Sequence, residues 1–385
     1  MFYKKNSTED LSIELFKNPT CEYRGTPFWA WNGKLEKELL GDEIDAFKQM
    51  GFGGFHMHSR TGLATPYLSD EFMDMVKFCT QKAKNNHMLA YLFDEDRFPS
   101  GAAGGFVTCN PKYRERFLKL TLEPTEHFSK EQAITEGLPF LLATYDIVLN
   151  EKGELKKYSR INETDSTKGK KYYAYLCTST ATEWYNNQTY LDTLNKEAVE
   201  RFVNLTIGKY KEAVGEDFGK TVPSIFTDEP RTVRKQPLTF ATGSEDAIFP
   251  WTFDFENRFK DKNGFDILDK FPEIVWDLPK NKVSRARYLY HDYLAEAFTE
   301  TFADTYGKIS QYPCADNTGF LTERLKIYNE YMSRPYVTGK DLIDAGLEPG
   351  KRFSEILEYA HKLRLAGTEK QSALKQALSY GRKIK

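Results

Sequence analysis

The sequence has few cysteines and no long apolar segment. Its five cysteines are odd in number and scattered, and no two of them form a Cys-x-x-Cys pair. This spacing argues against a disulfide framework and favours a reducing compartment. The N-terminus carries two lysines followed by polar and acidic residues, unlike a signal peptide. No run approaches the roughly 18 apolar residues that a membrane span requires. We therefore expect a soluble, cytoplasmic protein without a membrane partner.

The sequence also lacks an excess of charge of either sign. Its 54 Lys and Arg residues nearly balance 56 Asp and Glu residues, giving a net charge of -2 over 385 residues. This balance does not favour nucleic acid as a partner. Aromatic residues, in contrast, are abundant: Phe and Tyr number 28 and 23. Two explanations stay open, because such rings either fill a core or stack on the faces of sugars.

Several short apolar runs each end in polar, chemically capable residues. Amphipathic segments separate the first three of these runs, as in the βαβ units of a parallel sheet. The runs end at Asn32, His58, Asp96 and Pro230, and a fifth strand, near residues 311–320, is weakly marked. The expected fold class is therefore α/β: an incomplete or atypical TIM-like (β/α) barrel over residues 25–330.

Two further segments do not follow the barrel pattern. Residues from about 115 to 180 are rich in β-formers and contain a hairpin turn, which predicts a β insertion between the third and fourth barrel strands. A long helix is expected over residues 285–309. Residues 335–385 carry two helical patterns, 353–365 and 370–383, and predict a small helical appendage.

Carboxylates gather where the third and fourth predicted strands end. Because the carboxyl ends of parallel strands meet at one face, we expect Asp94, Glu95 and Asp96 to share a mouth with Asp228 and Glu229. Like charges raise one another's pKa, so one carboxyl group can keep its proton beside an ionised one. Glycoside cleavage requires such a pair. We predict Glu229 as the general acid, with Asp228 positioning it or binding a hydroxyl group.

The second catalytic carboxylate stays open in the sequence. Glu95 is one candidate, beside its neighbours Asp94 and Asp96, and Glu323 after the weak fifth strand is another. Other strand-end side chains are predicted to bind the substrate, although the two tryptophans fit a core equally well. These residues are Trp29, Trp31, His56, His58, Arg60, Asp94, Asp96 and Arg97.

His56 and His58 lie two residues apart and so on one side of an extended strand. They fit hydrogen bonding to a ligand, a structural role, or metal binding. A zinc site normally needs at least three protein ligands, and the other histidines are placed elsewhere. Asp94, Asp96 or Asp228 would have to complete the set, which suits a harder ion. We expect no metal site, and a metal-dependent hydrolase remains an alternative.

Five motifs resemble the barrel domain of glycoside hydrolase family 106, the α-L-rhamnosidases. They are PFWAWNGKL, GFGGFHMHSRTGLATPYLS, YLFDEDRFPSGAAGG, WYNNQTYLDTLN and VPSIFTDEPR, spread over about residues 25–240. The resemblance implies a (β/α) barrel, inverting cleavage of a rhamnose-like or other deoxy-sugar glycoside by two carboxylates and, in some members, a calcium ion near the sugar. It also adds Tyr185, Asn187, Tyr190 and Asp192 as site residues.

The chain departs from this family in two respects. Family members are usually far longer, and the carboxylate expected in a Thr-Gly-His-type motif has only the stretch Thr318 to Glu323 as a counterpart, without the histidine. Self-association or a partner chain would then complete the barrel, or the chain is a non-catalytic carbohydrate-binding remnant. From Arg334 to Gly350 the sequence is similar to the helical end of tRNA nucleotidyltransferase-like proteins, but the catalytic head of that family is absent upstream.

Overall fold

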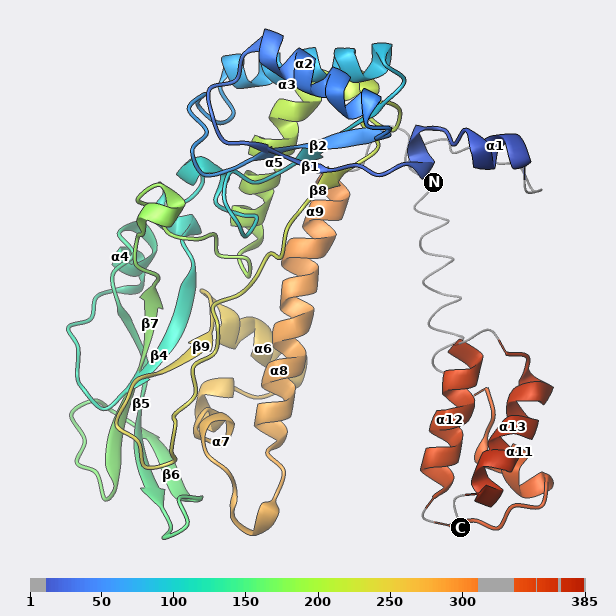
Figure 1. Cartoon of the computed structure of the whole chain (residues 1–385). Coiled ribbons are helices and arrows are strands. Elements are labelled where there is room, and N and C mark those ends of the chain that lie inside the picture. Colours follow the sequence, from blue (N-terminus) through green and yellow to red (C-terminus); the bar gives the residue numbers. More distant parts are fainter. Residues whose placement is uncertain (1–11, 311–335, 351, 366–367, 384–385) are drawn as a thin grey trace. The chain divides into compact units, whose positions relative to one another are not determined.

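The computed structural model describes residues 12–310, 336–350, 352–365 and 368–383 (Figure 1). The chain divides into two compact units, Phe2–Tyr312 and Pro313–Lys385. The larger unit holds every strand of the described residues and two separate sheets. The mixture of helices and strands confirms the α/β class.

The first sheet is parallel and has four strands in the order β1-β2-β3-β8. These strands are β1 (Phe28–Trp31), β2 (Gly54–Ser59), β3 (Leu89–Phe93) and β8 (Ile225–Phe226). Within the described residues the sheet ends at β1 and β8 and does not close, so the predicted barrel is not seen there. The expected fifth strand and Glu323 lie outside the described residues.

Helices α2 (Lys37–Gln49), α3 (Asp70–Asn85) and α5 (Lys196–Val214) belong to the same part of the fold. Helix α3 begins where its sequence signal lies, because the Ser69 side chain accepts a hydrogen bond from the backbone N–H of Phe72 at 3.2 Å. The buried faces of α2 and α3 pack with alternate strand residues in one core. That core contains Trp29 and Trp31, whose exposed fractions are 7% and 2%. Both tryptophans therefore pack the fold and are not available as a sugar platform.

The second sheet is antiparallel, with five strands in the order β6-β5-β7-β4-β9. Four strands fall where the sequence predicts a β insertion, and the last follows β8, in a segment that carries no strand signal. The strands are β4 (Arg116–Thr121), β5 (Phe140–Leu149), β6 (Leu155–Ile161), β7 (Lys170–Thr178) and β9 (Ala247–Pro250).

One large aromatic core joins this second sheet to the helices that follow it. Trp251, Phe271 and Tyr290 are completely or almost completely buried in it. The expected long helix is present as α8 (Arg285–Phe298), a π-helical segment (Thr299–Ala303) and α9 (Asp304–Ile309), which form one continuous helix in Figure 1. The other helices of the larger unit are α1 (Ile13–Lys17), α4 (Lys130–Thr135), α6 (Phe255–Asn263) and α7 (Pro272–Val275).

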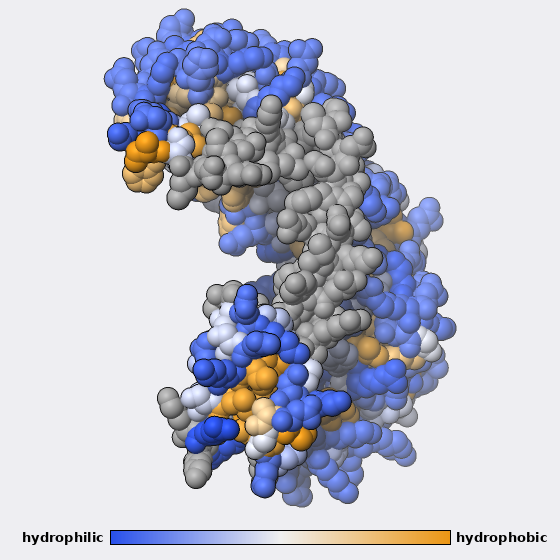
Figure 2. Space-filling view, turned by 90° about the vertical axis from the view of Figure 1, so that its right-hand side faces the viewer, coloured by the Kyte–Doolittle hydropathy of each residue, from blue (hydrophilic) through white to orange (hydrophobic). Residues whose placement is uncertain are grey.

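The smaller unit contains α11 (Gly339–Asp344), α12 (Phe353–Leu365) and α13 (Lys370–Lys383) around its own apolar core. Two of these helices lie where the sequence predicts them. In the described part of the chain, no helix combines the length and the apolar character needed to cross a bilayer. Among the coloured residues of Figure 2 most are hydrophilic, and the apolar ones gather in limited patches.

Candidate functional site

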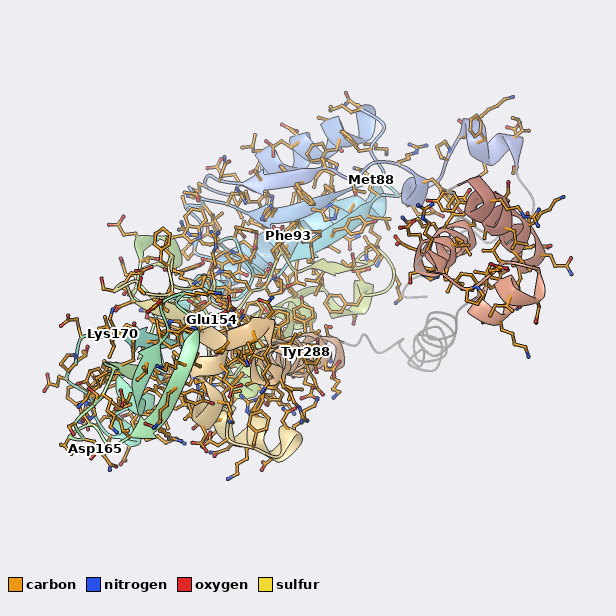
Figure 3. The ribbon with its side chains drawn as sticks, turned by 90° about the horizontal axis from the view of Figure 1, so that it is seen from below. Met88, Phe93, Glu154, Asp165, Lys170 and Tyr288 are labelled. Atoms are coloured by element: carbon orange, nitrogen blue, oxygen red, sulfur yellow. The ribbon has the colours of Figure 1, made fainter. Side chains whose placement is uncertain are left out.

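The face of the parallel sheet opposite its core carries a cluster of rings. Strand alternation sends Phe55 and Met57 to the core, so His56 and His58 lie on the opposite face. The His58 ring stacks on Phe93 with 3.8 Å between centroids, and Phe93 stacks on Phe226 at 4.7 Å. Figure 3 labels Phe93 at the end of β3. The rim of the cluster is open, because 36% of Phe226 is exposed.

Glu95 is held beside this cluster by hydrogen bonds at the end of β3. Its Oε1 lies 2.8 Å from Nε2 of His58, and both side chains are almost fully buried. The Ser100 hydroxyl donates to Oδ1 of Asp94 at 2.5 Å and lies 3.4 Å from Oε2 of Glu95. One serine hydroxyl thus contacts two of the predicted carboxylates.

Ser100 also connects the end of β3 to the end of β8. The Asp228 backbone N–H donates to the Ser100 hydroxyl at 2.8 Å, and the Ser100 N–H donates to the Asp228 carbonyl at 2.9 Å. The predicted meeting of the two strand ends is therefore found at the backbone of Asp228. The next residue, Glu229, has a φ of +41°. Such a conformation is strained for a residue with a side chain, and strained residues often cluster at functional sites.

The Glu229 side chain is exposed, and within the described residues its carboxylate makes no hydrogen bond or ion pair. The crowding of acids expected around Glu229 is found instead around Asp94. Burial raises the pKa of Asp94 to about 7, although the hydrogen bond from Ser100 opposes this rise. The site therefore has a buried carboxyl group with a raised pKa, that of Asp94, and a separate accessible carboxyl group, that of Glu229.

Asp96 and Arg97 organise the loop that follows β3. Asp96 accepts hydrogen bonds from the Gly104 N–H at 2.8 Å and from the Asn186 side chain at 3.0 Å. Arg97 donates to the same asparagine at 3.1 Å. Burial raises the pKa of Asp96. Asp96 and Arg97, both predicted from the sequence, thus join the loop after β3 to the segment around residue 186.

Tyr190 and Arg231 form a second connection to Ser100. The Tyr190 hydroxyl donates to the Ser100 carbonyl at 2.5 Å, and the Arg231 guanidinium lies 4.6 Å from the centre of the Tyr190 ring. Arg231 pairs with Glu115 at 2.6 Å. The sequence analysis missed both Arg231 and Glu115. The position of Arg231, two residues after Glu229, could have indicated a site residue. Glu115 precedes a strand of the β insertion, and nothing in the sequence around it indicates a site.

The remaining predicted residues take different places. Asp192 is buried beside the second sheet, where its carboxylate accepts a hydrogen bond from Thr252 at 2.6 Å, and burial raises its pKa to about 7. Tyr185 lies near Tyr190, with 5.5 Å between ring centroids. Asn187 and Arg60 are exposed. Of these residues, Tyr185 lies beside Tyr190, which is bonded to Ser100, and Asp192 supports the fold.

The histidines do not assemble a metal site. His58 is engaged by Glu95, and His56 stacks on Tyr91 with 4.4 Å between centroids, while burial lowers its pKa. Within the described ranges, no group of three or more His, Cys, Asp or Glu side chains could hold a metal ion. These residues therefore fit neither zinc nor the calcium that the family resemblance implies.

Comparisons with known proteins found similarity among solved structures and no match in sequence. No protein-family model matches the sequence, and no curated protein matches it. The resemblances to glycoside hydrolase family 106 and to tRNA nucleotidyltransferases therefore stay predictions. Among solved structures, the chain is similar to a rhamnosidase from Novosphingobium sp. PP1Y, with a TM-score of 0.47 and 12% sequence identity. The similarity covers 77% of this chain and 46% of that protein, so the chain spans under half of that structure's length.

Proposed function

We propose that the ends of β2, β3 and β8 form the site of a glycoside hydrolase. The observation that carries this proposal is the double role of Ser100, whose hydroxyl contacts the carboxylates of the β3 end and whose backbone binds Asp228. The chain segments that carry carboxyl groups at these two strand ends are thereby held at one edge of the sheet. Glycoside cleavage is the reaction that two such groups perform without a metal.

The two catalytic roles fall to Glu229 and Glu95. Glu229 is accessible and gives its proton to the oxygen that leaves with the departing group. Glu95, oriented by His58 and Ser100, takes a proton from the water that attacks the sugar carbon. The products are the free sugar and the alcohol, with inversion at the attacked carbon. Asp228 positions Glu229 through its backbone bonds to Ser100.

The sugar we propose is rhamnose or another deoxy-sugar. Phe28 and Phe226 are 59% and 36% exposed, and their rings lie 5.5 Å apart, so they offer an apolar surface on the same sheet face as His58. A methyl group in place of a hydroxymethyl group leaves a sugar with one polar group fewer to desolvate against such rings.

Hydrolysis of an aryl rhamnoside by Glu229→Gln and Glu95→Gln tests the proposal. Each change removes a proton-transfer group and keeps its shape, so the rate should fall by about 100-fold or more. Glu200→Gln is the matched control, since Glu200 lies on α5 with 44% of its side chain exposed. Turnover by Glu229→Gln at the wild-type rate would overturn the assignment.

A non-catalytic carbohydrate-binding protein is the second candidate. It is favoured by the open parallel sheet, since β1 and β8 each have only one neighbouring strand within the described residues. Rhamnose binding by calorimetry with no turnover of any rhamnoside by wild-type protein would identify this candidate. Closure of the sheet by a second copy of the chain stays a prediction, which sedimentation equilibrium would check.

A further inference from the structure

Two adjoining cavities lie on the larger unit, lined by residues of the β5–β6 turn, the segment before β9, and α8. Their volumes are about 860 and 330 Å³, and they share Lys152, Glu154, Asp277 and Arg287 as lining residues. None of the carboxylates at the ends of β3 and β8 lines either of them. Figure 3 labels Glu154 and Tyr288, which line the larger cavity from the turn and from α8. Both volumes fall within the range typical of small-molecule sites.

Lys235 carries a positive charge on the wall of the smaller cavity. Its Nζ lies 3.2 Å from Nε2 of His291 and 5.3 Å from the centre of the Phe249 ring. Across the described residues no carboxylate lies within ion-pair distance of Lys235. An ammonium group has three N–H donors, so two remain for a ligand after the bond to the imidazole.

Arg287 strengthens the positive field but offers little direct bonding. Its guanidinium donates to Asp277 at 2.8 Å, to the Trp276 carbonyl at 2.7 Å and to the Ile274 carbonyl at 3.0 Å. Planar carboxylates are recognised best by a free guanidinium fork, whereas a lysine binds phosphate as a point charge. The unsatisfied donors of Lys235 therefore favour a phosphate group.

Four basic residues, Lys235 among them, line the two cavities against three acidic ones, which are Glu154, Asp277 and Asp292. Asp277 is paired with Arg287, and Glu154 accepts a hydrogen bond from the Asn150 side chain at 2.7 Å. The larger cavity adds an aromatic wall, since 65% of Tyr288 is exposed. A ring lying against this tyrosine would extend from a phosphate bound at Lys235.

We propose that these two cavities bind a small phosphorylated ligand, with its phosphate at Lys235 and its sugar or other ring against Tyr288. This site is separate from the proposed glycosidase site and does not depend on it. Burial and the neighbouring Arg287 lower the pKa of Lys235, and a bound phosphate dianion would offset that repulsion.

Calorimetric titration with inorganic phosphate and with glucose 6-phosphate at low ionic strength tests the proposal. Wild-type protein should bind both saturably, and Lys235→Met, which keeps the apolar stem, should bind each about tenfold more weakly or worse. Lys77→Met is the matched control, because Lys77 lies on α3 with 53% of its side chain exposed. Absence of saturable binding, or equal affinity of Lys235→Met and wild type, would overturn the site.

Two further measurements separate the phosphate and ring contacts. Tyr288→Ala should weaken the binding of glucose 6-phosphate and leave the affinity for inorganic phosphate unchanged. An affinity for glucose 6-phosphate equal to that of wild type would refute the ring placement. The wild-type protein supplies a test that needs no variant. Bound phosphate should protect Lys235 from acylation, measured by mass spectrometry of peptides, while Lys77 reacts as before, and unprotected Lys235 would contradict the proposal.

Discussion

Asp94 should make the protein less stable as the pH rises toward neutrality. Burial raises the pKa of this carboxyl group from 3.8 to about 7 in the folded chain. Between these two values the unfolded chain has lost its proton while the folded chain keeps it. Because the folded state then binds more protons, the free energy of unfolding falls with rising pH, and the fall ends above about pH 7.

The magnitude follows from the separation of the two pKa values. A difference of about three pH units corresponds to ~4 kcal/mol in total, at ~1.4 kcal/mol per unit. Over the accessible window from pH 5 to 8, integration gives about 2–3 kcal/mol. Asp94→Asn removes this dependence and keeps an oxygen that accepts the Ser100 hydroxyl. Titrating groups that do not interact with Asp94 contribute equally to both proteins and cancel in the difference.

Urea denaturation followed by tryptophan fluorescence at intervals of pH measures this difference. Relative to wild type, Asp94→Asn should gain stability steadily from pH 5 to pH 7 and then level off. Asp74→Asn is the control, since Asp74 lies on α3 with 58% of its side chain exposed and should give a curve parallel to wild type. Parallel curves for Asp94→Asn and wild type would refute the reasoning.

Three other substitutions test the packing around the site. Ser69→Ala removes the cap of α3 and should lower the free energy of unfolding by ~1 kcal/mol, measured by urea denaturation. Gly54→Ala places a Cβ against a backbone carbonyl of β3 and should lower the free energy of unfolding by about 3 kcal/mol or more. Gly33→Ala places its Cβ in open space and should keep the wild-type stability, and thermal melts of both variants measure the difference. Tyr190→Phe removes the donor to Ser100 and should cost ~1 kcal/mol, and an unchanged melting temperature would contradict that bond.

Local patterns in the sequence were sufficient for much of the secondary structure. The periodicity of 353–365 and 370–383 predicts α12 and α13 at their observed bounds, and Ser69 predicts the start of α3. These signals depend on neighbours a few residues apart. Strand β9 carried no comparable signal, because its four residues become a strand by pairing with β4, which lies more than a hundred residues earlier.

The candidate site was predictable only in part. The carboxylates at the ends of β3 and β8 were visible as polar residues after apolar runs, and the backbone of Asp228 does meet Ser100. The alternation in β1 placed Trp29 and Trp31 on one side, but it does not say which side faces the helices. Glu115, which directly precedes β4, pairs with Arg231, which follows β8 more than a hundred residues later.

The sequence by itself determined many of the helices and strands, the α/β class and the acidic strand ends, since these depend on residue spacing and local backbone preference. Tertiary structure alone decided that the tryptophans fill the core, that Asp94 is buried while Glu229 is exposed, and that Lys235 faces a cavity without an acidic partner. Burial and long-range pairing come from segments far apart in the chain, and no local pattern contains them.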